Sequence, residues 1–165
     1  MRIILCGPGA SGKDHLKRQF EAKGFRKSIS YTTREPREGE VDGVHYYFVD
    51  EQKFLKLIED GVFYEWQIYP TTKEDGTEIK PYYGTANEDF FKATLFIMTP
   101  AGLRDLKPAD RATSMVIYLD IPEETRRARL GGRKNADKVE TRIENDRKDF
   151  ENFTDYDIRI ENADF

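Results

Sequence analysis

Residues 7–14 read Gly-Pro-Gly-Ala-Ser-Gly-Lys-Asp and stand between an apolar run and a helical pattern. The apolar run at residues 3–6 predicts a buried strand, and Leu16 and Phe20 lie one turn apart on the helix expected next. A strand, a glycine-rich loop with the spacing Gly-x4-Gly-Lys and a helix N-terminus form the context of a phosphate-binding loop. The alternative is a glycine-rich turn that carries a solvated lysine.

The loop has the chemistry that a nucleoside triphosphate requires. Glycines tolerate unusual dihedral angles and close approach, so backbone N–H groups can point toward a phosphate. The helix N-terminus adds partial positive charge, and Lys13 adds a full charge that can reach the terminal phosphates. Asp14 stands where a Ser or Thr hydroxyl usually binds Mg²⁺, and we expect its carboxylate to contact the metal instead. The predicted triphosphate contacts are Gly7, Gly9, Ala10, Ser11, Gly12, Lys13 and Asp14.

The composition describes one polar globular domain. At 165 residues the chain is long enough for a substantial core. Its 27 basic and 31 acidic residues give a formal charge of −4, which argues against a general nucleic-acid binder. Cys6 is the single cysteine, so no internal disulfide can form. The chain has neither an apolar run of membrane-spanning length nor a secretory signal, and we expect a cytoplasmic enzyme without a membrane partner.

Strands alternate with helices along the rest of the chain. Apolar or alternating runs predict strands at residues 25–29, 46–49, 63–68, 94–98, 115–119 and 156–160. Helices are predicted at residues 51–60 behind the cap Asp50, from Pro100, at 123–130 and at 138–153. This alternation indicates an α/β layered fold with a mainly parallel core sheet.

Two helices carry predicted apolar faces, and one polar segment predicts a hairpin. The faces are Phe54, Leu55 and Ile58 on the helix at 51–60, and Val139, Ile143, Phe150 and Phe153 on the helix at 138–153. Residues 71–81 are polar and centre on Asp75-Gly76, a hairpin turn signal.

A second polar constellation lies between residues 30 and 46. Arg34 and Arg37 are three residues apart, and an arginine fork binds phosphate through parallel hydrogen bonds. Together with a tyrosine hydroxyl, the two arginines would hold a monophosphate. Standing alone, such a charged run describes a solvated loop.

The pattern Ser-x-Thr-Thr-Arg-x-x-Arg-x-Gly-Glu-x-x-Gly-x-x-Tyr at residues 30–46 resembles the acceptor-nucleotide site of guanylate kinases. The resemblance continues through Phe-Tyr-Glu-Trp at 63–66, Tyr-Tyr-Gly-Thr at 82–85 and the arginine-rich residues 126–147. With the glycine-rich loop it spans most of the chain. It implies a single guanylate-kinase-like domain at 1–165 with a three-layer P-loop fold. The implied parts are a core at 1–29, 86–128 and 148–165, a strand-rich monophosphate-binding insert at 30–85 and a helical lid at 129–147.

The resemblance also implies an acceptor-nucleotide site. The residues that would hold the acceptor phosphate are Arg34, Arg37, Tyr46 and Tyr83. The residues that would face the guanine base are Ser30, Glu65 and Thr85. A carboxylate at Glu65 makes chemical sense there, because it can accept hydrogen bonds from the N1–H and the exocyclic amine of guanine together.

On the donor side, the resemblance implies ATP and a mobile arginine-rich lid. Arg129, Arg133 and Arg142 are similar to the lid arginines, which stabilise charge on the transferring phosphoryl group. The implied catalytic residues are Lys13, Arg133 and Arg142. Asn162 sits where the family's core approaches the adenine of ATP.

The chain departs from the family pattern at Asp14 and at two further places. Thr99 follows the strand at 94–98, where guanylate kinases carry acidic residues near the metal and the acceptor, and a hydroxyl cannot replace that charge. Residues 71–81 look like an insertion beside the base pocket. The insertion is either a tolerated surface hairpin or a segment that gates the pocket or alters nucleotide choice.

The resemblance therefore implies an ATP-dependent, Mg²⁺-dependent kinase that makes GDP or dGDP from GMP or dGMP. Thr99 and the insertion suggest a related alternative, a kinase with a different base or sugar preference. A rival from another class is a non-catalytic guanylate-kinase-like module that holds a phosphorylated peptide. Such modules have an eroded phosphate loop, whereas Gly7, Gly12 and Lys13 are intact here. The sequence does not decide whether the acceptor carries ribose or deoxyribose, or whether the protein is a monomer or a homodimer.

Overall fold

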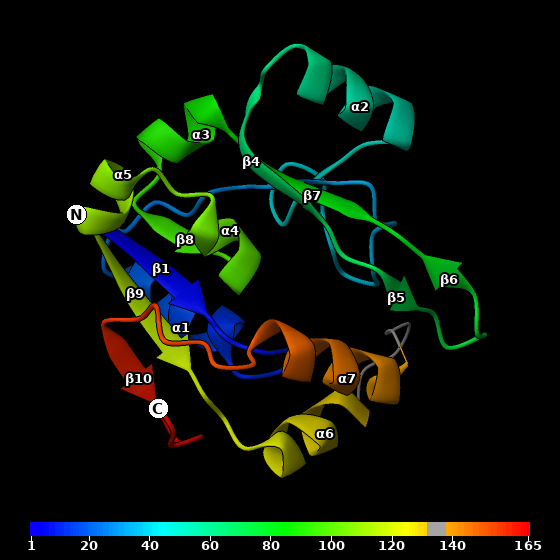
Figure 1. Ribbon diagram of the computed structural model, residues 1–165, viewed down its shortest axis with the longest axis vertical. Coiled ribbons are helices and arrows are strands. Elements are labelled where there is room, and N and C mark those ends of the chain that lie inside the picture. The colour runs from blue at the N-terminus through cyan, green and yellow to red at the C-terminus, as the bar shows by residue number, and fades with distance from the viewer. Residues whose placement is uncertain (132–137) are drawn as a thin grey trace.

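The predicted apolar strands form one parallel sheet in the computed structural model, which describes residues 1–131 and 138–165 (Figure 1). The strands, in spatial order, are β10 (Ile158–Ile160), β9 (Ser114–Leu119), β1 (Arg2–Cys6) and β8 (Leu95–Ile97). All neighbouring pairs run parallel, and Ile4 of β1 lies opposite both Phe96 and Val116. The predicted α/β fold with a mainly parallel core sheet is confirmed.

Both faces of this core sheet are covered, because alternate residues of a strand point to opposite sides. On one side, Ile3 and Leu5 pack against α1 (Lys13–Ala22). On the other side, Ile4 and Cys6 pack with side chains from helices farther along the chain. A strand enclosed on both faces needs a continuous apolar run, and β1 has one.

The prediction of a strand at residues 25–29 is wrong. This segment runs along the sheet edge beside β8, but only Lys27 makes a bridge, opposite Leu95. The N–H of Arg26 donates to the Thr94 hydroxyl at 3.0 Å instead of to a backbone carbonyl. A side-chain acceptor has taken the place of a ladder partner, so the regular pairing is confined to one bridge.

A second sheet is built from the segment predicted to be the insert. Its strands, in spatial order, are β3 (Tyr47–Phe48), β2 (Tyr31–Thr32), β7 (Tyr82–Ala86) and β4 (Phe63–Ile68). β4 and β7 are antiparallel, with Glu65 opposite Thr85. Figure 1 shows this sheet as a separate layer from the core sheet.

The helix α2 (Glu51–Glu59) covers part of the second sheet. The Asp50 side chain accepts from the N–H of Lys53, so the predicted N-cap is confirmed. Phe54 is fully buried and stacks on Phe63 with 4.5 Å between ring centroids. Leu55, expected on the same face, is 41% exposed, because the next residue of a helix is turned about 100° away.

The polar segment at residues 71–81 forms the predicted hairpin. Its strands are β5 (Thr71–Thr72) and β6 (Glu78–Ile79), which pair antiparallel. Gly76 adopts φ 89° at the turn, a conformation that glycine tolerates without strain. In Figure 1 the hairpin extends away from the second sheet, and β5 lies close to α7.

The helices after the second sheet are α3 (Asn87–Lys92), α4 (Pro100–Arg104), α5 (Pro108–Ala112), α6 (Glu123–Gly131) and α7 (Val139–Asp149). α4 begins at Pro100, as predicted, and the Thr99 hydroxyl caps it by accepting from the N–H of Gly102. The short helices α3 and α5 were not predicted. Within the described parts of the chain, no helix has the length and apolar character of a membrane span.

The helix predicted at 138–153 is shorter in the structure. α7 ends at Asp149, and Asn152 adopts the left-handed conformation with φ 54° in the turn that follows. The predicted common apolar face is divided between two clusters. Ile143 packs with Ala10 of the glycine-rich loop, whereas Phe150 packs over the core sheet.

Candidate functional site

The glycine-rich loop (residues 7–13) connects the end of β1 to α1. Its backbone is unusual at Ala10 (φ 60°) and at Gly12 (φ 98°), which precedes the first turn of α1. A Cβ atom on Gly9 would lie 2.8 Å from Nε of Arg142 and 3.2 Å from Oδ2 of Asp146. A side chain at residue 9 would therefore require the side chains of Arg142 and Asp146 on α7 to shift.

Lys13 is held against the loop by backbone oxygens. Its Nζ donates to the carbonyl oxygens of Gly7 (2.6 Å) and Pro8 (2.8 Å). Burial, reinforced by the nearby Arg142 and opposed by Asp146, lowers the pKa of Lys13 to about 8. A buried ammonium beside a guanidinium creates a local demand for negative charge, which a phosphate group can satisfy.

Asp146 joins the glycine-rich loop to α6 and α7. Its Oδ2 accepts from the N–H of Gly9 (2.9 Å) and from Nη1 of Arg126 (3.2 Å). Asp146 and Arg126 are 3% and 6% exposed, so this ion pair is buried. The other carboxylate oxygen lies 3.8 Å from Nε of Arg142, one helical turn earlier. Sequence reasoning missed Asp146, although the spacing Arg142-x3-Asp146 on a predicted helix was a readable signal.

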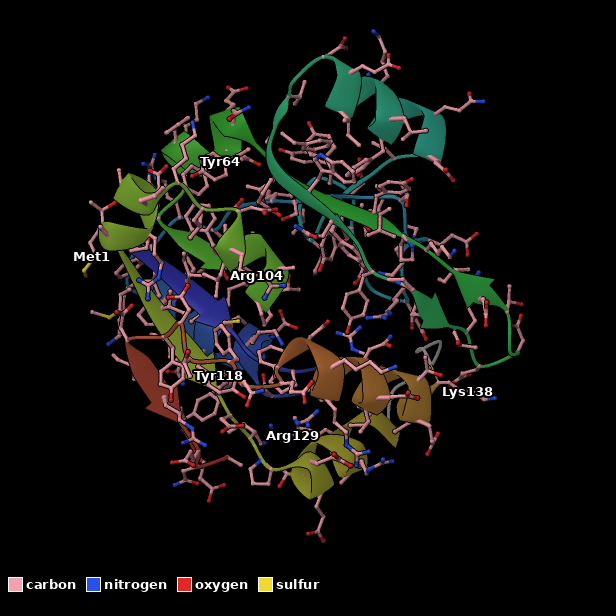
Figure 2. All side chains as sticks on the ribbon, viewed as in Figure 1. Met1, Tyr64, Arg104, Tyr118, Arg129 and Lys138 are labelled. Atoms are coloured by element: carbon pink, nitrogen blue, oxygen red, sulfur yellow. The ribbon has the colours of Figure 1, made fainter. Side chains whose placement is uncertain are left out.

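The predicted lid arginines differ in their placement. Arg129 of α6, labelled in Figure 2, donates to the carbonyl oxygens of Ala10 (3.1 Å) and Ala163 (3.4 Å), so it ties the loop to the C-terminal segment. The guanidinium carbon of Arg142 lies 5.0 Å from the ring centroid of Tyr69. Arg133 lies outside the described residues.

A pocket of about 170 Å³ brings the glycine-rich loop, the insert and α7 together. Its polar lining combines Lys13, Asp14, Arg37, Tyr46 and Arg142, which come from segments far apart in the sequence. We call it the phosphate pocket. Burial, reinforced by neighbouring Tyr83, raises the pKa of Tyr46 to about 12, so its hydroxyl stays protonated and can donate. Three cationic side chains and a phenol donor suit an anionic ligand with several oxygens.

Arg34 lies beside this pocket and is already engaged. Its Nη2 donates to both carboxylate oxygens of Glu40 (2.8 and 2.9 Å), and its Nη1 donates to the carbonyl oxygen of Glu35. Its guanidinium carbon lies 5.4 Å from the ring centroid of Tyr46, and the ring of Tyr46 meets that of Tyr83 edge-on. The predicted phosphate-holding residues are therefore neighbours.

A second, larger pocket of about 710 Å³ lies between residues 33–37 and the β5–β6 hairpin. Arg37 lines both pockets, and Arg34 lines the larger one. Acidic and basic side chains are mixed along its wall, which gives this pocket no preference for one sign of charge.

The residues predicted to face the base lie on β4, β7 and the segment before β2. The Thr85 hydroxyl donates to Oε1 of Glu65 at 2.6 Å, and burial raises the pKa of Glu65 against the opposing effect of this hydrogen bond. A Cβ on Gly102 would lie 3.4 Å from Oε2 of Glu65 and 3.7 Å from Oγ1 of Thr99. Glu65 and Thr99 therefore share one corner at the start of α4. The carbonyl oxygen of Ser30 accepts from the N–H of Tyr47, and Ser30 does not line the phosphate pocket.

The predicted metal residue, Asp14, lies in the first turn of α1. Its carboxylate is 66% exposed and lies 3.0 Å from Nζ of Lys17. The described residues contain no cluster of three or more His, Cys, Asp or Glu side chains suited to a metal. Mg²⁺ is usually held by one or two carboxylates together with substrate phosphates and water, so a single carboxylate at the rim of the phosphate pocket fits this ion.

Asn162, predicted to lie near adenine, is exposed in the segment after β10. Its Oδ1 accepts from the N–H of Asp164 at 3.0 Å, which closes a local turn. The C-terminal segment lies close to the loop, because Phe165 would contact a Cβ on Gly12 at 2.8 Å. Asn162 thus belongs to the same C-terminal segment as Phe165 but does not line the phosphate pocket.

Comparison with known proteins agrees with this geometry. The family model described as guanylate kinase matches residues 1–165. The guanylate kinase of Wolinella succinogenes is 32% identical, over 98% of this chain and 76% of the relative. The guanylate kinase of Sulfurimonas denitrificans is 34% identical, over 97% of this chain and 79% of the relative. The chain belongs to the guanylate kinase family.

A solved structure supports the fold. The crystal structure of guanylate kinase from Anaplasma phagocytophilum superposes with a TM-score of 0.71 over 99% of this chain and 77% of that one. The two sequences are 22% identical, so this match concerns the fold. The resemblance read from residues 30–46 and from the glycine-rich loop is confirmed at the level of family and fold.

Proposed function

We propose that the chain works as an ATP-dependent nucleoside-monophosphate kinase that converts GMP or dGMP into GDP or dGDP. The observation that carries this proposal is the phosphate pocket, where Lys13 of the loop meets Arg37 and Tyr46 of the insert and Arg142 of α7. In phosphoryl transfer the protein itself performs little covalent chemistry. It requires two phosphates aligned in one place whose negative charge is neutralised.

The two ends of the pocket bind different nucleotides. On the donor side, the loop residues 7–14 hold the ATP phosphates, Lys13 reaches the terminal ones, and Asn162 lies toward adenine. On the acceptor side, Arg37 and Tyr46 bind the monophosphate together with Arg34 and Tyr83. Arg34 exchanges part of its ion pair with Glu40 for the incoming phosphate, since its guanidinium is already oriented by that carboxylate.

The transferring phosphoryl group is stabilised by Arg142 and Arg133, together with Lys13. Asp14 would hold Mg²⁺, which when bound neutralises the triphosphate and orients it. To do so, Asp14 must leave its ion pair with Lys17, an exposed pair that contributes little to stability. Guanine is recognised by Glu65, with Ser30 and Thr85 beside it. The raised pKa of Glu65 reflects the burial of a carboxylate that has no cationic partner among the described residues, and this carboxylate gains from the two donors of guanine.

The same proposal covers the organisation of the chain. Residues 1–29, 86–128 and 148–165 form the core, residues 30–85 form the acceptor-binding insert and residues 129–147 form the lid. The enzyme works in the cytoplasm on small nucleotides, as a monomer or homodimer, without nucleic-acid or membrane partners. The rival proposal of a phosphopeptide-binding module is less well supported, because the buried Lys13 and the intact loop have no role in it.

The test is a coupled assay of ADP release over a panel of ribo- and deoxyribonucleoside monophosphates. GMP or dGMP should be phosphorylated with a kcat/KM roughly 10⁴-fold above that of AMP or dAMP, because adenine cannot donate from N1 and leaves the Glu65 carboxylate without the two donors that guanine supplies. A panel in which dAMP or dTMP matched dGMP would refute the guanine preference. Absence of turnover with every nucleotide would favour the binding module.

A further inference from the structure

The hairpin insertion docks directly on the helix that carries Arg142. Its stem, residues 69–72, follows β4 and makes successive contacts with α7. The carbonyl oxygen of Pro70 accepts from Nδ2 of Asn145 at 2.7 Å. The carbonyl oxygen of Thr72 accepts from the N–H of Lys138 at 2.8 Å, at the end of α7 nearest the hairpin (Figure 2).

The contacted residues share one face of α7. Lys138, Arg142 and Asn145 are spaced by four and three residues, the spacing of neighbours on one side of a helix. The stem residue that meets Arg142 is Tyr69, whose ring centroid lies 5.0 Å from the guanidinium carbon. Nε of Arg142 also lies next to Gly9, where an added Cβ would be only 2.8 Å away. The Arg142 side chain is therefore enclosed between the glycine-rich loop and the Tyr69 ring.

The geometry points to Tyr69 as a positioning residue that holds the Arg142 guanidinium at the phosphate pocket. This inference rests on the proposed function, in which Arg142 stabilises the transferring phosphoryl group. An arginine side chain has many rotamers, and the face of an aromatic ring fixes the plane of the guanidinium through cation–π attraction. The segment between β4 and the hairpin thus contributes to the active site through Tyr69.

The charges around Tyr69 show why Arg142 needs such a support. Burial raises the pKa of the Tyr69 hydroxyl, so the phenol stays neutral. The charged groups that act on this hydroxyl are Arg142, Asp146 and Asp149. Asp146 and Asp149 are on the same helix as Arg142 and compete for its guanidinium with any phosphate in the pocket. A neutral ring orients the arginine without adding a further negative charge that would compete with the phosphoryl group.

The experiment compares Tyr69→Leu with Tyr69→Phe, in the parent and in an Arg142→Ala background. Tyr69→Leu removes the aromatic face and should lower kcat about tenfold, while KM for GMP and for ATP stays within about twofold, since the arginine acts on the transition state. Tyr69→Phe keeps the ring and should stay within about twofold of the parent. In the Arg142→Ala background, Tyr69→Leu should have no further effect on kcat, because the group that it positions is gone.

Each other outcome identifies what is wrong. If Arg142→Ala alone turns over like the parent, the role of Arg142 in the proposed function is refuted. If Arg142→Ala is slow but Tyr69→Leu is not, the positioning role alone is refuted. An equal loss from Tyr69→Leu in both backgrounds shows a general packing defect and also overturns the inference. Tyr69→Met carries the same prediction if thermal unfolding shows that Tyr69→Leu is not folded at the assay temperature.

Discussion

Lys13 sets the electrostatic character of the site. Its ammonium is buried and donates to the carbonyl oxygens of Gly7 and Pro8, with the cation Arg142 nearby. Carbonyl dipoles compensate a buried charge only partly, which is why the pKa of Lys13 is lowered to about 8. A bound phosphate supplies the missing negative charge. ATP binding and protonation of Lys13 should therefore be coupled.

This coupling predicts how activity depends on pH. The pKa of Lys13 lies below its ordinary value of 10.5, so the folded enzyme loses the Lys13 proton at a lower pH than the unfolded chain does. The kcat/KM for ATP should therefore fall above about pH 8. The fall should approach tenfold per pH unit, as expected for loss of one proton. The same shift disfavours folding below about pH 8, and this cost is relieved as the pH rises toward 10.5.

The measurement is the pH profile of kcat/KM for ATP at constant ionic strength. Lys13→Arg is the matched control, because a guanidinium keeps its charge throughout this range. Its kcat/KM should start lower than that of the parent and stay level above pH 8. A parent profile that stays level up to about pH 10 would show that kcat/KM for ATP does not depend on the charge of Lys13.

Among the secondary-structure elements, the glycine-rich loop, α6 and α7 are joined by one buried ion pair. Asp146 of α7 accepts from Arg126 of α6 and from the N–H of Gly9. Removing one partner of a buried pair leaves the other charge without compensation, which costs far more than the loss of an exposed pair. The relative placement of these three elements should therefore depend on Asp146.

Asp146→Ala should lower the free energy of unfolding by about 3–5 kcal/mol, measured by urea denaturation. The exposed Lys56–Asp60 pair on α2 provides the comparison. Lys56→Ala should leave the free energy of unfolding almost unchanged, because water screens that pair. A loss below about 1 kcal/mol for Asp146→Ala would contradict the view that its charge holds Arg126 and the loop in place.

The elements that the sequence predicted well carry strong local signals. β1 is apolar from Ile3 to Cys6, α2 has its cap at Asp50, and α4 begins at Pro100. The elements that it missed are short. α3 and α5 have six and five residues, too few for a hydrophobic period to show. Residues 25–29 looked like a strand, but the Thr94 hydroxyl at the sheet edge was invisible to local pattern reasoning.

The candidate site divides in the same way. Lys13, Arg37, Tyr46 and Arg142 belong to motifs, and the fold brings them to one pocket. Asp146 and Tyr69 belong to no motif. The spacing of Asp146 from Arg142 was a readable signal, but the contacts of Asp146 with Gly9 and Arg126, like that of Tyr69 with Arg142, are made by the tertiary structure. Gly9 and Asp146, for example, are 137 residues apart in the chain. The individual roles of the site residues remain predictions.

At the scale of the whole molecule, the phosphate pocket exists only because three parts of the chain converge. The core sheet presents the glycine-rich loop at the end of β1, the insert presents Arg37 and Tyr46, and α7 presents Arg142. Figure 1 shows α7 and the insert approaching the end of the core sheet from different sides. An arrangement of this kind aligns a donor and an acceptor phosphate, and alignment is the main requirement of phosphoryl transfer.

The most direct test of this account is the rate of GDP formation from ATP and GMP by the parent and by Lys13→Ala. Lys13→Ala should remain folded, because its partner is the ligand, and its kcat/KM should fall by about 10³-fold. Lys56→Ala, a lysine replaced on the exposed face of α2, should match the parent. A folded Lys13→Ala protein that makes GDP at nearly the parent rate would contradict the account.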